Sequence, residues 1–245
     1  MIATAMNTET LYSHDVAVAF DAAYSVSDTS AFTTVVTYLP ADGLPLYESV
    51  KRALDVALAM VAIVLVLPLA GLIAFAVKLT SPGPVFFLQM RAGLHGRPFR
   101  MFKFRSMVVD AEARLPELVN IAELAQPVYK LKHDPRVTRV GRFLRRFGLD
   151  ELPQLINVLR GEMSLVGPRP EALPLVDRYN AEQRRRLLVK PGITGYQQIQ
   201  NRGMPDMAAR LAYDLHYLHH RNVLMDLSIL ARTVIVIAAG KEITY

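Results

Sequence analysis

The feature that most constrains this chain is an uncharged apolar run of 22 residues, 56–77, far from the N-terminus. About 20 such residues form a helix long enough to cross the hydrocarbon core of a bilayer. The apolar core of a signal peptide is shorter and lies closer to the chain start. The run therefore predicts a membrane-associated helix, and a helix buried inside a soluble protein is the weaker alternative.

Pro68 lies in the middle of this run, where proline removes a backbone hydrogen bond and kinks a helix. Lys51 and Arg52 precede the run and Lys78 follows it. Cationic flanks favour the cytoplasmic side, so these residues favour a re-entrant hairpin with both ends on one face. Residues 1–50 contain no Lys or Arg, which favours translocation and a simple span. Both topologies stay open on these residues alone.

The charge is divided unevenly along the chain. Residues 1–50 carry six Asp or Glu, whereas the remainder carries all 28 Lys and Arg with 16 acids. A basic body binds anions such as phosphorylated substrates or anionic lipid. No nucleic-acid-binding motif is legible, so nucleic acid is not an expected partner. The absence of Cys excludes disulfides and thiolate metal sites.

Periodicity and turn residues predict a mostly helical α+β fold behind a tail with little fixed structure, residues 1–46. Within the tail, a short strand is predicted at Thr33–Tyr38. Two further strands are predicted at Val85–Met90 and Phe99–Met107. The predicted helices are Asp110–Ala125, interrupted by Pro116; Arg139–Phe147, capped by Thr138; Leu152–Leu159; Tyr179–Val189; Asp206–Arg221; and Asp226–Ala239. The last is apolar but charged, which favours a position at the membrane interface.

Asp150 and Glu151 form an acidic pair between a basic segment and the sequence Gly167-Pro168-Arg169-Pro170. Two adjacent carboxylates raise the pKa of one of them, and a helix start beside them attracts phosphate. The pair therefore favours phosphoryl chemistry with a carboxylate nucleophile. Taken alone, Asp150 is more simply interpreted as the N-cap of the following helix.

Several cations surround the pair in sequence. Lys103 and Arg105 alternate along a predicted strand, so they would share one face and could hold a diphosphate; a solvated face is an equal alternative. Arg145 lies on the cationic side of a predicted helix just before the pair. This side could bind phosphate, and contact with anionic lipid is the alternative interpretation. Arg169 lies between two prolines, and this rigidity suits bidentate phosphate contact, with a structural turn as the alternative.

Two other polar groups are interpreted as surface features. Arg184, Arg185 and Arg186 form a run that favours a surface or membrane-facing position. His216, His219 and His220 share a predicted helix, but no carboxylate–histidine signature accompanies them, so metal binding there is the weaker interpretation.

Six short motifs follow one another along the chain: Ser81-Pro82-Gly83-Pro84, Phe87–Gly93, Lys103–Met107, Gly148–Gln154, Gly167–Pro170 and Pro191–Gly195. In this order they resemble the motifs of the bacterial sugar transferase family, the monotopic polyprenyl-phosphate phosphoglycosyl transferases. The resemblance covers about residues 48–240 and is nearest to the short exopolysaccharide-initiating members. One departure is Leu67, where the family commonly has Ser before the proline.

The resemblance implies a fold and a location. It implies an α+β, mostly helical, membrane-associated monotopic fold with one re-entrant N-terminal helix hairpin and amphipathic interfacial helices. The expected parts are a flexible acidic tail, 1–46, a re-entrant membrane helix, 47–80, and a cytoplasmic catalytic domain, 81–245. The expected location is the cytoplasmic face of the bacterial inner (plasma) membrane, with the lipid bilayer as partner. A homo-oligomer is left open.

The resemblance also implies a reaction between a UDP-sugar and undecaprenyl phosphate, through a covalent phosphosugar–aspartate with release of UMP. Asp150 would be the nucleophile and a Mg²⁺ ligand, and Glu151 its base or electrostatic partner. Lys103, Arg145 and Arg169 fall on positions that the family associates with phosphate binding, and Arg105 is added to them because it alternates with Lys103 on the predicted strand. The donor sugar stays open between a hexose and an N-acetylated or dideoxy amino sugar. A non-catalytic membrane scaffold of a polysaccharide assembly complex is the alternative from another class.

Overall fold

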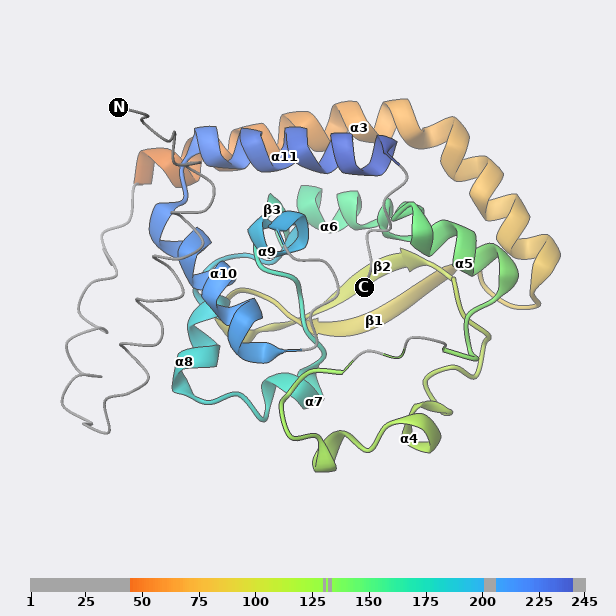
Figure 1. Ribbon diagram of the computed structural model, residues 1–245. Coiled ribbons are helices and arrows are strands. Elements are labelled where there is room, and N and C mark those ends of the chain that lie inside the picture. The colour runs from red at the N-terminus through yellow and green to blue at the C-terminus, as the bar shows by residue number, and fades with distance from the viewer. Residues whose placement is uncertain (1–44, 130, 132–133, 201–205, 240–245) are drawn as a thin grey trace, which may run out of the picture. The chain divides into compact units, whose positions relative to one another are not determined.

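The computed structural model describes residues 45–129, 131, 134–200 and 206–239 (Figure 1). All of them belong to the unit that begins at Pro45. The acidic tail, apart from its last two residues, and the strand predicted at Thr33–Tyr38 lie outside the described residues.

Helix α3 (Pro45–Thr80) contains the apolar run and continues through Pro68. Its buried residues recur at helical spacing on both sides of the proline, from Asp55 and Ala59 to Ile73 and Val77. Figure 1 shows α3 running beside α11 and then bending toward α5. The whole length of the helix therefore packs on the body of the protein.

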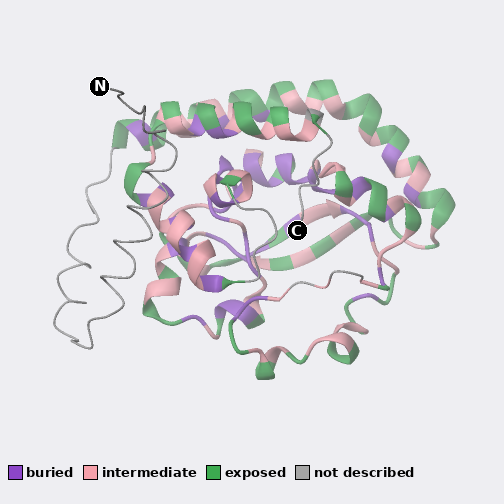
Figure 2. Cartoon of the chain, viewed as in Figure 1, coloured by how far each residue is buried: buried purple, intermediate pink, exposed green. Residues whose placement is uncertain are grey.

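The outer side of α3 is exposed, as the green segments of Figure 2 show, and many of its exposed residues are large and apolar. Val64 is 71% exposed and Phe75 is 65% exposed. Soluble helices rarely leave such a continuous apolar face in water. By length and composition, α3 is the one helix among the described residues that could cross a membrane. The prediction of a helix fit for membrane association is confirmed, whereas its re-entrant course stays a prediction.

Strands β1 (Phe86–Ala92) and β2 (Pro98–Phe104) form an antiparallel hairpin around the 3₁₀ turn η1 (Leu94–Gly96). Both strands were predicted, but β2 ends at Phe104 and does not run to Met107, so Arg105 lies just beyond it. The side-chain amide of Asn157 lies at the outer edge of β2. It accepts a hydrogen bond from the Phe102 N–H at 3.0 Å and donates one to the Arg100 carbonyl at 2.7 Å. This amide takes the place of a third strand and ties β2 to helix α6 (Gln154–Arg160).

Helix α5 (Arg139–Arg146) begins where the sequence predicts, because Thr138 accepts a hydrogen bond from the Gly141 N–H at 2.9 Å. Gly141 lies against the end of β2, and a Cβ there would come within 1.8 Å of the Ser106 carbonyl oxygen. After α5, Gly148 adopts a positive φ of 67° and opens the 3₁₀ turn η3 (Leu149–Glu151). This sharp turn carries the acidic pair between α5 and α6.

Two predicted helices are wrong in extent. Residues 110–125 contain only α4 (Leu115–Leu118) and η2 (Ile121–Glu123), since Pro116 is tolerated in a first turn but not in a helix interior. Residues 179–189 hold α8 (Ala181–Arg184) and η4 (Arg185–Leu188) instead of one helix.

The parallel pair β3 (Ser164–Val166) and β4 (Gly192–Thr194) was not predicted, because three residues carry no readable period. The remaining helices are α7 (Leu173–Val176), α9 (Tyr196–Gln200), α10 (Met207–His220) and α11 (Val223–Ala238). The predictions of α10 and α11 are confirmed, since the ends of both helices lie within three residues of the predicted ends. The mostly helical α+β fold is therefore confirmed, and the interfacial position of the amphipathic helices stays a prediction.

Candidate active site

Asp150 and Glu151 lie in η3 and are almost inaccessible, at 2% and 3% exposure. Asp150 is not the N-cap of the next helix: that position is Pro153, and no side chain caps it. The capping interpretation of Asp150 is therefore wrong. Two buried acids need nearby cations or hydrogen bonds to offset their desolvation.

Glu151 receives that compensation from two distant segments. The Lys103 ammonium, from β2, lies 2.6 Å from its Oε1, and the Arg169 guanidinium, from the loop after β3, lies 3.4 Å from the same oxygen. All three side chains are buried or nearly so, which strengthens their attraction. The fold thus brings together three of the residues predicted for the site.

Asp150 is in a different position from its neighbour. Its Oδ1 atom is buried and has no hydrogen-bond partner among the described residues. Burial raises the pKa of Asp150; the charge of Lys103 opposes this, and the charge of Glu151 adds to it. A buried carboxylate oxygen that the surrounding chain does not use is a natural candidate for contact with a reactant or a cation.

A cavity of about 280 Å³ lies beside the pair. Its walls come from the β-hairpin, the segment after it, α5, the loop after β3, and α10. Most of the charged side chains in these walls are cationic, as expected for a site that binds an anion. The predicted site residues that line it are Lys103, Arg105, Arg145, Asp150 and Arg169.

The two remaining predicted cations hydrogen-bond to other groups, although the positive charge of Arg145 still lowers the pKa of Asp150. The Arg145 Nε donates to the Ser106 Oγ at 3.0 Å. Arg105 donates to the Ser81 carbonyl at 2.7 Å, and its Nε and Nη1 are buried with no partner among the described residues. Lys103 and Arg105 therefore both line the cavity, but only Lys103 contacts Glu151.

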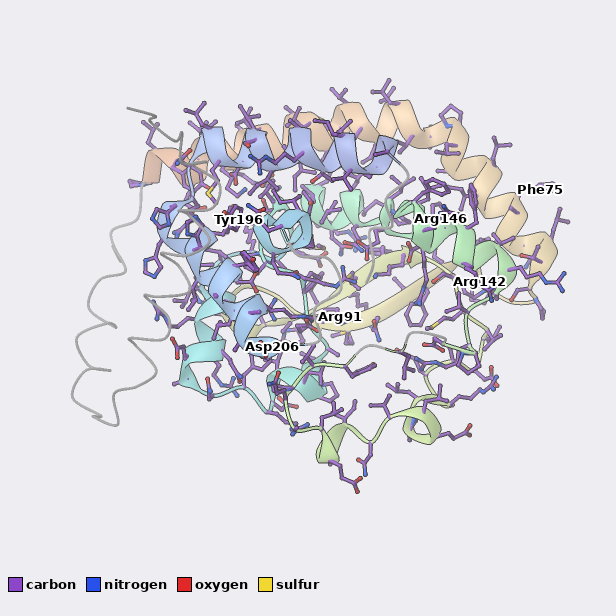
Figure 3. All side chains as sticks on the ribbon, viewed as in Figure 1. Phe75, Arg91, Arg142, Arg146, Tyr196 and Asp206 are labelled. Carbon is purple, nitrogen blue, oxygen red and sulfur yellow. The ribbon has the colours of Figure 1, made fainter. Side chains whose placement is uncertain are left out.

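Sequence reasoning missed three further cations of the cavity, Arg91, Arg136 and Arg210. Arg91 of β1 donates to the Gln89 Oε1 at 3.0 and 2.6 Å, and its central place in the fold is labelled in Figure 3. Arg210 of α10 lies 3.2 Å from the Glu171 Oε1. Arg91 lies one residue beyond the strand that was predicted to end at Met90, and its alternation with Gln89 could have extended that strand to include it. No local signal marks Arg210.

Arg186 corrects the interpretation of the arginine run as a surface feature. Arg184 is exposed, but the Arg186 side chain is 3% exposed and lies 2.8 Å from the Asp214 carboxylate. Asp214 is 28 positions further along the chain, on α10, so sequence proximity could not reveal the pair.

The residues fit Mg²⁺ in the way it commonly binds with phosphate substrates, through one or two carboxylates and phosphate oxygens. The unpartnered Oδ1 of Asp150 is an oxygen donor of that kind. No group of three or more His, Asp or Glu in the described part of the chain could hold a metal unaided. The His216 ring instead stacks on the rings of Tyr196 and His220, with centroids 4.9 and 4.3 Å away.

Comparison with known proteins identifies the family. The family model described as bacterial sugar transferase matches residues 46–240, which is most of the chain. The chain belongs to the bacterial sugar transferase family. The matched residues run from α3 to the end of the described part, so they contain the acidic pair and every wall of the cavity.

Individual bacterial sugar transferases are also similar to this chain. The UDP-glucose:undecaprenyl-phosphate glucose-1-phosphate transferase of Escherichia coli is 43% identical over 207 residues, 78% of this chain and 42% of the relative. A UDP-N-acetylgalactosamine-undecaprenyl-phosphate N-acetylgalactosaminephosphotransferase of Aeromonas hydrophila is 39% identical, over 80% and 45%. The exopolysaccharide production protein ExoY of Rhizobium meliloti is 40% identical, over 78% and 86%. The chain thus spans less than half the length of the first two.

Proposed function

We propose that this chain transfers a sugar 1-phosphate from a UDP-sugar to undecaprenyl phosphate and so starts a lipid-linked exopolysaccharide. The observation that carries this proposal is the buried, unpartnered Oδ1 of Asp150 beside a cavity lined by cations. Burial of an acidic pair costs desolvation free energy, and a passive scaffold would gain nothing in return. A carboxylate nucleophile, by contrast, has to be held in position to react. The E. coli and Aeromonas relatives are named for the same acceptor, undecaprenyl phosphate.

In the first half of the reaction, an Asp150 oxygen attacks the phosphorus that bears the sugar. A carboxylate–phosphorus bond forms, the bond from that phosphorus to the bridging oxygen breaks, and UMP leaves with the electron pair. In the second half, a phosphate oxygen of undecaprenyl phosphate attacks the same phosphorus. The bond to Asp150 breaks, the carboxylate is regenerated, and undecaprenyl-diphospho-sugar is released.

The residues around Asp150 support both halves of this reaction while they keep the ion pairs described above. Glu151 keeps Lys103 and Arg169 beside the nucleophile, where both can attract the diphosphate. Arg145 and Arg105 line the rest of the cavity and add positive charge. Mg²⁺, when bound, neutralises diphosphate charge, and Asp150 is the residue that would hold it.

The proposed position is the cytoplasmic face of the inner membrane, with α3 re-entrant. The first part of α3 is tied to the body by Arg52, which donates to the carbonyls of Val158 and Leu159 at 2.6 and 2.9 Å. The part beyond Pro68 packs through Ile73 and Val77 against the same body. Anchoring of both parts of the helix to one body supports a re-entrant course over a simple span, and its exposed apolar side suits insertion into one leaflet.

Labelling of single cysteines tests this topology, since the chain has no Cys of its own. Cysteine at Ser30 and cysteine at the exposed Asp177 are both expected to resist an impermeant thiol reagent in intact spheroplasts and to react after lysis. The Cys-free protein is the control for background. If the Ser30 site reacts in intact spheroplasts and the Asp177 site does not, α3 crosses the membrane.

A panel of nucleotide sugars tests the activity. With undecaprenyl phosphate and detergent-solubilised protein, at least one UDP-hexose or UDP-N-acetylhexosamine should release UMP and yield a lipid-linked sugar. The E. coli and Aeromonas relatives are named for glucose and N-acetylgalactosamine, so both sugars belong in the panel. Absence of UMP release with every UDP-sugar would contradict the proposal.

A further inference from the structure

The loop that carries Arg169, Gly167–Glu171, is held from outside in an unusual way. Pro168 and Pro170 have no N–H, so the loop cannot form a regular ladder of its own. Instead, four successive carbonyl groups each accept from another segment. The donors are the Gly192 N–H to Pro168 at 2.9 Å, Arg186 to Arg169 at 3.2 Å, Arg91 to Pro170 at 3.4 Å, and the Ala92 N–H to Glu171 at 3.0 Å.

Arg186 is the donor to the carbonyl of Arg169 itself. Its guanidinium is fully enclosed and contacts three further groups: the Asp214 carboxylate at 2.8 Å, the Tyr179 hydroxyl at 2.8 Å and the Glu171 carboxylate at 3.7 Å. Burial opposes its charge, but the carboxylates and Tyr179 outweigh this and raise the pKa of Arg186 above its ordinary value. Arg186 is therefore a charged, fixed fork.

This fork connects the loop to the acidic pair in two short steps. Arg186 holds the backbone of Arg169, and the Arg169 side chain reaches Glu151 beside the nucleophile. Because Pro170 follows Arg169, the backbone of Arg169 has a narrow range of ψ. A displacement of the Arg169 carbonyl therefore also moves the Arg169 side chain. Small errors in the position of a phosphate-binding cation reduce rates strongly.

We propose that Arg186 is a positioning residue that holds Arg169 in place for binding the diphosphate of the donor, an inference that rests on the proposed function. Lysine at position 186 could still pair with Asp214, but its single ammonium cannot also reach the Arg169 carbonyl and Tyr179 as a planar fork does. Arg186→Lys therefore keeps the charge and removes the positioning.

A double-mutant cycle on UDP affinity tests this proposal in the full-length protein. The dissociation constant of UDP is measured calorimetrically for the wild type, Arg186→Lys, Arg169→Ala and the double variant. We expect Arg186→Lys to weaken UDP binding about tenfold in the wild-type background, the loss typical of a charged hydrogen bond. In the Arg169→Ala background it should change affinity by less than about twofold. In turnover assays, Arg186→Lys should likewise raise the KM for the donor when Arg169 is present and change it little in the Arg169→Ala background.

The adjacent arginine offers a matched control. Arg185 pairs with Glu182 at 3.9 Å and lies 3.2 Å from the His219 ring, and neither contact involves Arg169, so Arg185→Lys should bind UDP as the wild type does. Thermal midpoints show whether each variant is folded. If Arg186→Lys does not fold, Tyr179→Phe, which removes one Arg186 contact with little change in volume, takes its place in the cycle.

Two results would overturn the proposal: wild-type affinity in Arg186→Lys, or the same loss of affinity whether or not Arg169 is present. The second would mean that Arg186 acts as general structural support. A wild type that binds UDP but transfers no sugar phosphate refutes the proposed function alone, and the binding cycle still tests Arg186. A wild type that does not bind UDP refutes both.

Discussion

Asp150→Asn is expected to abolish sugar-phosphate transfer, with a loss on the order of 10⁴-fold or more, as for other covalent nucleophiles. The asparagine amide has nearly the same shape, but its oxygen does not attack phosphorus as a carboxylate does. Two measurements check this: UMP release, and the mass of the protein after incubation with donor in the absence of acceptor. The wild type should gain one sugar phosphate, and the variant should gain none.

The fold of this variant should survive, because Asp150 is not a helix cap and its negative charge is buried. Asp177→Asn is the matched control, since it makes the same chemical change at an exposed position and should leave turnover unchanged. Glu151→Gln should be severely impaired by a different route, because Lys103 and Arg169 would lose the charge that holds them. Wild-type UMP release from Asp150→Asn would remove Asp150 from its proposed role.

Removal of divalent cations is expected to stop turnover completely, and Mg²⁺ or Mn²⁺ should restore it. The donor brings a diphosphate to a site that already holds two carboxylates, so the phosphate charge needs a hard cation with oxygen ligands. The measurement is UMP release after exhaustive EDTA treatment, followed by addition of single metals. Addition of Zn²⁺ alone should not restore UMP release.

The thermal midpoint is the control for this experiment. The described residues contain no cluster that could hold a metal without substrate, so EDTA should leave the midpoint unchanged while turnover is lost. A parallel fall in stability would indicate a structural metal. Full activity after EDTA treatment would contradict the proposed role of Mg²⁺.

Elements with strong local signals could be predicted from the sequence. Thr138 caps α5 as expected, because a cap depends only on residues three positions apart. The hairpin of β1 and β2 follows from alternation and a turn between the strands. The helix predicted over 110–125 was wrong in extent: Pro116 lies in the first turn of α4, so the helix could not extend back to Asp110. Strands β3 and β4 pair through distant segments and have almost no local signal.

The sequence by itself determined the membrane-associated helix, the acidic pair and the family, because each is written in consecutive residues or in their order. Only the tertiary structure decided which cations meet the pair. Lys103 and Arg105 are equivalent by alternation, yet Lys103 contacts Glu151, 48 positions away, while Arg105 turns to Ser81. Arg186, equally basic in sequence to its two neighbours, is enclosed by Asp214 and holds Arg169. Local rules act over three or four residues, whereas buried charges are selected by partners that only the packed chain brings within reach.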